Sequence, residues 1–197
     1  MEDIKLQSQY FGSIPYWAAL VQAKAFYLDH HDRFEKQSYR NRTYILGPNG
    51  LQALVVPVEG RNKKLPMKEV KISYAEPWLR VHLNSLQTAY RSAPFFEYLY
   101  PEIETILLKK NTHLWELNQE VFGFLGKRLK VQLHAIEPNE KMLDLSHDFH
   151  PKRLKHELAP YPQVFQEKMG FTPHAGILDL LMNHLLEAPD YLRKLTL

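Results

Sequence analysis

The first part of the chain alternates apolar and polar positions in the way that strands do. Ile4 and Leu6 alternate with polar neighbours, which predicts a half-buried strand. Pro15 stands near the start of the apolar run 16–21, where a proline fits a first helical turn. The apolar run 25–28 then predicts a buried strand. Strand, helix and strand form a βαβ-like unit, with ligand groups expected at the C-terminal ends of its strands.

A β-hairpin is predicted next. Two apolar runs, 43–46 and 51–56, flank the tetrapeptide Gly-Pro-Asn-Gly at positions 47–50. An Asn-Gly pair between apolar runs is the strongest short signal for a hairpin. Segment 69–72 is predicted to add one more strand, and segment 131–134 a late one.

In the middle of the chain the apolar spacing becomes helical. Apolar residues recur on one helical face over 79–90 and again, in a longer helix, over 114–125. Pro94 and Pro101 are expected to separate an aromatic stretch from a helix at 103–107. A long polar loop is predicted over 137–160. Two last helices are predicted, at 164–165 and at 177–186.

These patterns together predict a mixed α/β (α+β) fold. The N-terminal βαβ-like unit and the β-hairpin are expected in one sheet, with the helical C-terminal half packed on it. A length of 197 residues suits one domain, so residues 1–197 are predicted to form a single domain.

Composition excludes several classes of protein. The chain has no cysteine, which excludes disulfides, thiolate nucleophiles and iron–sulfur clusters. Its net charge is only +3, from 25 basic and 22 acidic residues, so a nucleic-acid partner is not expected. No apolar run approaches the roughly 20 residues that cross a bilayer, and no secretory signal follows the acidic start. The protein is therefore expected to be soluble and cytoplasmic, with no membrane span.

The sequence Arg40-Asn41-Arg42 carries the leading idea about function. Side chains two positions apart on a strand lie on the same face, so Arg40 and Arg42 can bind one anion together. Their planar guanidinium forks suit carboxylates and phosphates. The alternative is a pair of arginines that bridge surface acids such as Glu35. We expect a pocket for a small anionic ligand in which Arg40, Asn41 and Arg42 bind the substrate.

Asp29 and His31 are the candidates for catalysis. They would share a face at the end of the second strand, and an Asp–His pair can orient an imidazole as a general base near neutral pH. The spacing fixes no third metal ligand, and the loop histidines at 147, 150 and 156 belong to a chain with ten histidines. No standard dinucleotide fingerprint or P-loop is present. Neither a metal nor a cofactor is predicted.

Two polar pairs stand at positions where a sheet or a helix can meet a ligand. Gln9 and Tyr10 close the first strand, from which a sheet presents ligand contacts. Tyr161 and Gln163 precede a helix whose free N–H groups can meet an anion. All four are candidate substrate-binding residues. A tyrosine in the core and a glutamine that caps a turn are the alternatives.

A third polar pair lies in the last predicted helix region. Asp179 and Asn183 are spaced i, i+4 and share a helical face beside an apolar stripe. They are candidate substrate-binding residues that form one wall of the pocket. The alternative is a polar network that pins the helix to the sheet.

Several short motifs occur one after another in a characteristic order. In the N-terminal half these are Gln7-x-Gln9-Tyr10-Phe11, Pro15-Tyr16, Asp29, Gln37-Ser38-Tyr39-x-Asn41-Arg42 and Val56-Pro57-Val58. The later ones are Tyr90-x-x-Ala93-Pro94-Phe95-Phe96, Tyr161-Pro162-Gln163-Val164-Phe165, Gly170-Phe171-x-Pro173 and Ile177-Leu178-Asp179-Leu180-Leu181-x-Asn183. This order resembles the WbqC-like protein family. The resemblance spans nearly the whole chain and implies one WbqC-like domain over residues 1–197.

The resemblance implies a role in surface-polysaccharide assembly, because some members of the family lie among genes for that process. The chain departs from the family near its C-terminus. The family's Pro-Asn-Leu-Ser is here Pro-His-Ala-Gly at 173–176, and the Gly-Pro-Glu turn expected after Asn183 is missing. The loss of these polar groups indicates a different ligand or a loss of activity.

The sequence supports two hypotheses about function. The first is a transferase-type enzyme that acts on an activated sugar, such as a sugar nucleotide, or on a small acyl donor. In it Arg40 and Arg42 hold the anion, and His31, oriented by Asp29, moves the proton. The second is a non-catalytic ligand-binding or scaffold protein that uses the same anion pocket. A His31→Ala variant separates them, because only an enzyme has turnover to lose.

Overall fold

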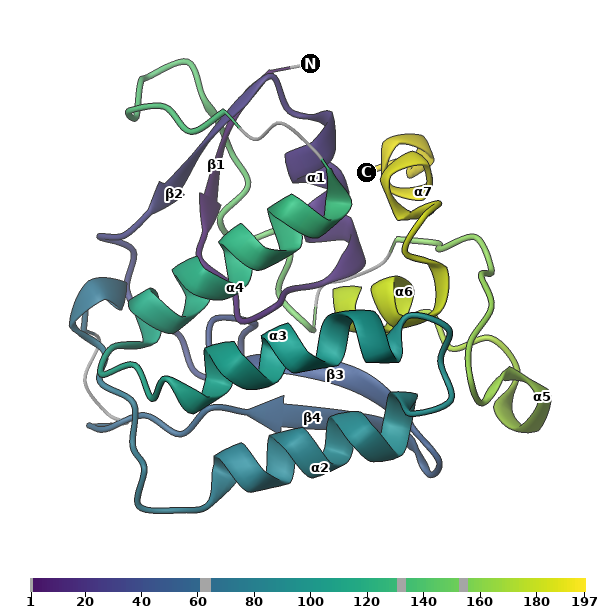
Figure 1. The fold of residues 1–197 in the computed structure, drawn as a ribbon. Helices are drawn as coiled ribbons and strands as arrows, with labels where there is room; N and C mark the ends of the chain where they lie inside the picture. The colour runs from purple at the N-terminus through teal and green to yellow at the C-terminus, as the bar shows by residue number, and fades with distance from the viewer. Residues whose placement is uncertain (1, 61–64, 131–133, 153–155) are drawn as a thin grey trace.

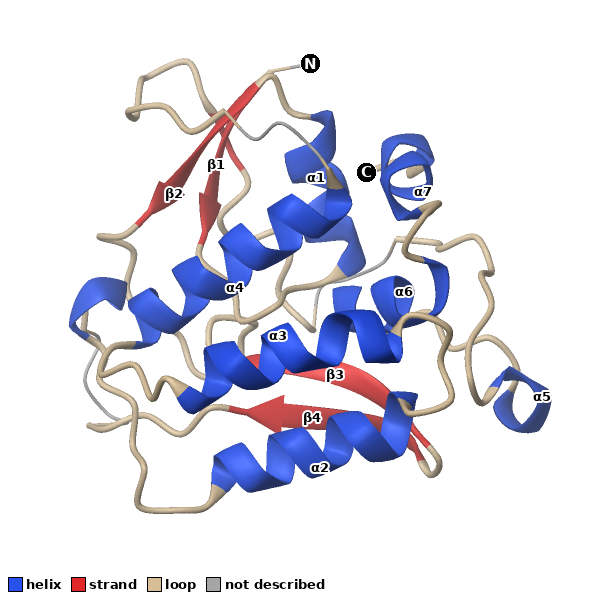
Figure 2. Cartoon of the chain, viewed as in Figure 1, coloured by secondary structure: helices blue, strands red, loops and turns tan. Residues whose placement is uncertain are grey.

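The computed structural model describes residues 2–60, 65–130, 134–152 and 156–197 (Figure 1). Within this part of the chain the strands form two small sheets with helices around them, and Figure 2 shows the two groups of strands apart from each other. The mixed α/β class predicted from the sequence is confirmed.

The N-terminal βαβ unit is present as predicted. β1 (Asp3–Gln7) pairs in parallel with β2 (Ala25–Asp29), and α1 (Ile14–Gln22) connects them. The Ser13 hydroxyl caps α1, and Pro15 occupies the first turn, where its missing N–H leaves no hydrogen bond unmade. Every residue of α1 from Ile14 to Leu20 is buried, which fixes the helix on the sheet.

A third strand joins this sheet from the segment predicted to be a polar loop. β5 (Leu143–Asp144) pairs in parallel with β1, so the strand order is β2-β1-β5. A strand of two residues is too short to show alternation, and the loop prediction is wrong at this point. Residues 131–133 of the predicted late strand lie outside the described residues. Close to them in sequence, Ala135 forms an isolated parallel bridge with Phe26.

The predicted hairpin is formed by β3 (Arg42–Gly47) and β4 (Gly50–Val55). The two strands are antiparallel over their whole length, which leaves residues 48–49 as the turn. Gly50 then adopts a φ of 105°, a left-handed value that glycine reaches without strain. The turn is therefore Pro-Asn followed by Gly, and the hairpin prediction is confirmed.

The expectation that the hairpin shares one sheet with the βαβ unit is wrong. In the described chain β3 and β4 form a sheet of their own. The Tyr44 carbonyl of β3 accepts a hydrogen bond of 2.7 Å from the Gly176 amide, so a helix start lies beside β3 at this point. Sheet membership depends on hydrogen bonds between segments far apart in sequence, and alternation within one strand does not encode them.

The helical elements come after the hairpin. The described chain contains the 3₁₀ turn η1 (Met67–Glu69) and the helices α2 (Trp78–Tyr90), α3 (Phe96–Leu108), α4 (Leu114–Leu129), α5 (Gln166–Met169), α6 (Ile177–His184) and α7 (Ala188–Lys194). The helices predicted over 79–90 and 114–125 are confirmed. Segment 69–72 is not a strand, because its residues form the end of η1 and two isolated bridges. No helix of the described residues is long and apolar enough to span a membrane.

The expectation that Pro101 separates two segments is wrong, because α3 runs through it. A proline inside a helix costs about 3 kcal/mol, since it lacks the N–H for the preceding turn. Buried apolar residues of α3 lie on both sides of it, among them Phe96, Leu99 and Ile103. Burial of such side chains contributes roughly 1.5–3 kcal/mol each, so their packing outweighs the defect.

The C-terminal helices pack against the start of the chain. Figure 1 shows α7 near α1, and the Gln22 side-chain amide donates to the carbonyls of Leu192 (2.7 Å) and Leu195 (2.9 Å). Residues 177–183 of α6 are all buried, so α6 is an internal helix. The C-terminal helices therefore pack on the N-terminal part of the chain, but α6 lies beside β3 of the hairpin and α7 lies on helix α1 and not on a sheet.

Gly176, the cap of α6, brings three segments together. Its amide donates to the Tyr44 carbonyl (2.7 Å), and the next amide, of Ile177, donates to the Gly12 carbonyl (3.2 Å). A Cβ on Gly176 would lie 2.8 Å from Thr43 Oγ1 and 3.0 Å from the carbonyl oxygens of Gly12 and Tyr44. A side chain at this position would therefore force these segments of this chain to shift.

Candidate functional site

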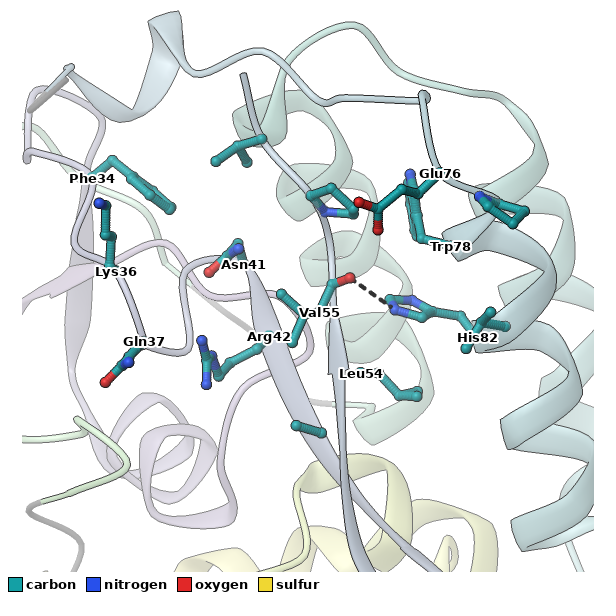
Figure 3. Close-up of a pocket in the computed structure, with 15 residues that line it drawn as sticks. Phe34, Lys36, Gln37, Asn41, Arg42, Leu54, Val55, Glu76, Trp78 and His82 are labelled. Atoms are coloured by element: carbon teal, nitrogen blue, oxygen red, sulfur yellow. Dashed lines mark hydrogen bonds between the residues drawn. The ribbon is translucent and has the colours of Figure 1, made fainter. Parts of the chain in front are cut away.

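A pocket of about 490 Å³ opens where the segment after β2 meets the hairpin and α2 (Figure 3). Volumes of roughly 300–1,000 Å³ are usual for small-molecule sites. Its apolar walls are Phe34, Ala53, Leu54, Val55, Pro57, Val58, Pro77, Trp78 and Val81. Its polar lining residues are Lys36, Gln37, Asn41, Arg42, Glu76 and His82. We call this site the Arg42 pocket.

Arg42, the first residue of β3, supplies a cation to this pocket. Its buried Nε has no hydrogen-bond partner in the described part of the chain, and no acidic side chain of that part forms an ion pair with its guanidinium. Figure 3 shows the side chain on the same side of the pocket as Lys36 and Gln37. The fold therefore leaves the Arg42 charge available to a bound anion.

Asn41 holds the strand beside Arg42 in place. Its Nδ2 donates to the Val56 carbonyl (2.8 Å), and its own carbonyl accepts from the Val56 amide (2.8 Å). Its buried Oδ1 has no partner among the described residues. Asn41 therefore lines the pocket with one satisfied amide group and one free acceptor.

Arg40 is placed differently from the prediction. β3 begins at Arg42, so Arg40 precedes the strand and the two arginines do not share a strand face. The Arg40 side chain is 1% exposed, and it donates to Asp32 from Nε (3.0 Å) and to Glu35 from Nη1 (3.1 Å). A buried guanidinium needs such partners, because an unpaired charge is costly to desolvate. The geometry matches the alternative of an arginine that bridges acids, and Arg40 does not line the pocket.

His82 of α2 is a pocket residue that the sequence pattern missed. Its Nε2 lies 3.2 Å from the Val55 carbonyl, and its Nδ1 lies 3.1 Å from the Tyr10 hydroxyl. Burial lowers the pKa of His82 from 6.5 to about 4, so the ring is neutral at pH 7. Since a carbonyl only accepts, Nε2–H donates to Val55 and Nδ1 accepts from Tyr10. Both ring nitrogens are occupied, which leaves His82 no free position for proton transfer.

Tyr10, predicted to bind substrate, therefore lies behind the pocket wall. Its side chain is fully buried, and burial raises the pKa of its hydroxyl. Its neighbour Gln9 is also buried, and both polar atoms of the Gln9 side chain have no partner among the described residues. The Gln9 Oε1 packs over Gly12, where a Cβ would meet it at 3.0 Å. The structure places both residues in the core beyond the end of β1.

The predicted catalytic pair stands at the end of β2. Asp29 Oδ1 accepts from the backbone amides of His31 (2.9 Å) and Asp32 (3.1 Å), and Oδ2 pairs with Lys5 Nζ (3.0 Å). The Asp29 carboxylate thus caps a turn by accepting from the backbone amide of His31. These contacts do not orient the His31 imidazole. The His31 ring lies 4.0 Å from the His30 ring. Neither Asp29 nor His31 lines the Arg42 pocket, and their catalytic role stays a prediction.

The four C-terminal candidates come together at α6. Asp179 Oδ2 accepts from the Tyr161 hydroxyl (2.9 Å) and from Gln163 Nε2 (2.7 Å), and Asn183 Nδ2 donates to the Asp179 carbonyl (2.8 Å). Burial raises the pKa of Asp179, although the bonds from Gln163 and Tyr161 act in the opposite direction. Gln163 also binds the backbone of Thr172 through both ends of its amide. This network pins α6, as the structural alternative expects, and it does not line the Arg42 pocket.

Trp78, His82 and Glu76 reach the pocket only because α2 packs beside the hairpin. Their sequence signal is the i, i+4 spacing of Trp78 and His82 on one face of α2, which is typical of an ordinary core pattern. Gln37 carries a stronger signal, since it opens the motif 37–42 and has a left-handed φ of 59°. In the described chain no group of three or more His, Asp or Glu side chains gathers as a metal site would require.

Comparisons with known proteins support the family resemblance that the sequence shows. A model of the WbqC-like protein family matches residues 7–148. The matched segment includes the Arg42 pocket and ends before the Tyr161 network. An uncharacterised protein of Mycobacterium tuberculosis, Rv1507c, is 25% identical over 222 residues, which cover 95% of this chain and 96% of that protein. No solved structure is similar enough to match. Because the family model covers more than half of the sequence, the chain belongs to the WbqC-like protein family.

Proposed function

We propose that the protein binds a small anionic ligand in the Arg42 pocket. The observation that carries this proposal is the Arg42 guanidinium, which lines the pocket and forms no ion pair with an acid of the described residues. A cation that the fold leaves unpaired in a pocket attracts an anion. A carboxylate or phosphate bound beside the guanidinium places a negative charge next to it and accepts a charge-assisted hydrogen bond.

The rest of the pocket narrows the class of ligand. Figure 3 shows Trp78 and His82 across the pocket from Arg42, and the apolar side chains of Val55 and Val81 line the same region. A ligand with an acidic group at one end and a planar or aliphatic group at the other satisfies both halves. A sugar nucleotide, whose diphosphate lies between a planar nucleoside and a sugar, and an acyl donor with an acidic group both combine these features. The resemblance to proteins encoded among surface-polysaccharide genes favours the same two classes.

A transferase-type reaction is the first candidate for the chemistry after binding, and Glu76 is the observation that favours it. Figure 3 shows the Glu76 carboxylate on the opposite side of the pocket from Arg42. In the proposed step an acceptor hydroxyl oxygen bonds to the anomeric or acyl carbon of the donor. The bond from that carbon to the leaving group breaks, the leaving group departs as an anion beside Arg42, and Glu76 takes the hydroxyl proton.

A non-catalytic binding protein is the second candidate. It is favoured by His82, whose two ring nitrogens are both occupied by hydrogen bonds within the fold. It is also favoured by the Pro-His-Ala-Gly sequence at 173–176, which lacks the polar groups of the family pattern. In this case the pocket holds its ligand through Arg42 and the apolar wall, and no bond is made or broken.

A thermal-shift screen tests the binding proposal. The panel holds nucleotide sugars, coenzyme A thioesters and inorganic phosphate, and it is run on the wild type, on Arg42→Gln and on Arg91→Gln. Arg91 is exposed and lies outside the pocket, so Arg91→Gln controls for the loss of one positive charge. A ligand at 100 times its Kd stabilises by about 2.7 kcal/mol, which raises Tm by roughly 5–10 °C at this chain length.

We expect a shift with one donor class in the wild type and in Arg91→Gln, and its loss in Arg42→Gln. An equal shift in all three proteins would place the ligand elsewhere and refute the proposal. Glu76→Gln then separates the two candidates. In an enzyme this variant keeps the shift and loses donor turnover by about 10²-fold or more, the usual contribution of a general base. No turnover in the wild type would leave the binding protein, whereas unchanged turnover in Glu76→Gln would show that Glu76 is not the base.

A further inference from the structure

A second pocket, of about 540 Å³, lies where the start of α3, the end of α4 and the junction of α6 and α7 meet. It is lined by Phe95, Tyr98, Lys127, Arg128, Lys130, Leu185, Leu186 and Pro189. None of these residues lines the Arg42 pocket. We call it the α4-end pocket, and its chemistry is independent of the function proposed above.

Three cations line the α4-end pocket. Arg128 is ion-paired with Glu102, and its guanidinium carbon lies 4.4 Å from the centre of the Tyr98 ring. Lys127 and Lys130 form no ion pair with any acid in the described part of the chain. The carbonyl end of α4 carries about half a negative charge. No acidic side chain is among the lining residues, so the charged side chains that line the described pocket are all cationic.

Large apolar side chains line the same pocket, and two of them are exposed to water. Tyr98 is 58% exposed, and Leu186 is 71% exposed although leucine is usually buried. Phe95, Leu185 and Pro189 continue the same wall. A ligand that covers this wall removes apolar surface from water, and a ligand without an apolar part gains nothing from it.

We propose that the α4-end pocket binds a free amphipathic anion, a molecule with an aliphatic or aromatic body and one carboxylate, sulfonate or phosphate group. The cations and the apolar wall line one hollow, so a single small ligand touches both. The volume of the pocket falls in the range of small-molecule sites. A membrane surface is a poorer fit, because lipid-binding segments carry clusters of about 4–8 basic residues. Here only two free lysines and one paired arginine line the described pocket.

The test uses the full chain and a fluorescent aromatic anion, anilinonaphthalene sulfonate. Decanoate is added as a competitor, and decanol as the neutral control with the same chain. The variants are Lys127→Gln with Lys130→Gln, and separately Leu186→Glu, which places a negative charge at the exposed mouth without touching the core. Lys24→Gln with Lys141→Gln is the matched control, because both lysines are exposed and neither lines the pocket. Arg42→Gln reports on the Arg42 pocket.

We expect decanoate, and not decanol, to displace the dye from the wild type, from the lysine control and from Arg42→Gln with equal affinity. Removal of two exposed charge contacts should weaken binding by about fivefold or more in the Lys127/Lys130 variant, and Leu186→Glu should weaken it as well. The proposal is overturned if the Lys127/Lys130 variant binds like the lysine control, or if decanol competes as well as decanoate. It is also overturned if only Arg42→Gln loses the dye.

A sedimentation assay separates a free anion from a lipid surface. Vesicles of phosphatidylcholine with phosphatidylglycerol present the same chemistry in a bilayer. We expect the protein to stay in the supernatant while free decanoate still displaces the dye. Pelleting with these vesicles, without displacement by free decanoate, would replace the proposed ligand with a membrane.

Discussion

His82 lines the Arg42 pocket, but its hydrogen bonds belong to the core. Its pKa of about 4 results from burial, which outweighs the opposite effect of the hydrogen bond to the Val55 carbonyl. The bond from the Tyr10 hydroxyl to Nδ1 needs the neutral ring. In the unfolded chain the same group titrates near 6.5. Between these two values the unfolded state binds a proton that the folded state does not. The free energy of unfolding therefore rises with pH through this window and falls as the solution is acidified.

A His82→Gln variant should remove this dependence on pH. From pH 7 to pH 5, the wild type should lose about 2 kcal/mol of unfolding free energy more than the variant, because 1.5 pKa units correspond to that amount. Urea unfolding of both proteins at the two pH values measures the difference. The variant can be less stable than the wild type at both pH values, because the test compares only the change in unfolding free energy between pH 7 and pH 5. Parallel slopes would show that His82 is not held neutral.

Gly176 gives a second prediction at the scale of one residue. A Cβ there would lie 3.0 Å or less from three oxygen atoms, two of them in the backbone. Gly176→Ala should therefore lower the free energy of unfolding by about 1–3 kcal/mol, as overpacking does. A Cβ added to Gly123, inside α4, would meet no atom within 4 Å. Gly123→Ala is the control and should raise stability by about 0.5–1 kcal/mol through helix propensity. Equal effects of the two substitutions in denaturant unfolding would contradict the packing argument.

Individual site residues could be predicted only where their motif is local. The motif around Asn41 and Arg42 marks a segment that does line a pocket. The sequence could not show that Arg40 turns inward to Asp32, because this depends on the path of the chain between β2 and β3. The place of Trp78 and Glu76 in the pocket could not be predicted for a similar reason, since it depends on packing between elements far apart in sequence. Whether any of these residues binds substrate stays a prediction.

At the scale of elements, those with a clear period could be predicted. β1, α1, β2, the hairpin, α2 and α4 all carry alternation or a helical stripe, and the structure contains them. β5 and α7 are too short to show a period, and they exist because other elements cover them. The prediction of one sheet failed because pairing partners are decided by contacts across the whole fold.

Pro101 leads to a prediction for α3. The residue is exposed, so Pro101→Ala creates no cavity and supplies the N–H that the helix lacks. The gain in helix propensity is about 3 kcal/mol. The unfolded chain without proline has a higher conformational entropy, which offsets about 1 kcal/mol of this gain. We expect the unfolding free energy to rise by about 1–2 kcal/mol, measured by urea unfolding at pH 7. A loss of stability would mean that proline fits this helix better than its missing hydrogen bond suggests.

At the scale of the whole molecule, the contact between α7 and α1 bears on the prediction of a single domain. Leu192 of α7 is fully buried, and its carbonyl accepts a hydrogen bond from Gln22. Leu192→Ala should lower the unfolding free energy by about 2–5 kcal/mol, as deletion of a buried leucine side chain does.

In one cooperative domain this loss appears in every probe. The near-ultraviolet signal of the tryptophans, which include Trp17 in α1 and Trp78 in α2, should shift together with the far-ultraviolet helical signal. Two separate transitions in Leu192→Ala would show that residues 1–197 do not unfold as one domain.

The same contact has a consequence for biosynthesis. The hydrogen bond from Gln22 to Leu192 joins residues 170 positions apart. At about 5–20 residues per second, a ribosome needs roughly 10–30 s to make the intervening chain. During that time the side of α1 that α7 will cover stays open to solvent or to a chaperone. The native packing around α1 is therefore completed only after Leu192 has been made, and pausing of the ribosome before that codon would prolong the exposed state.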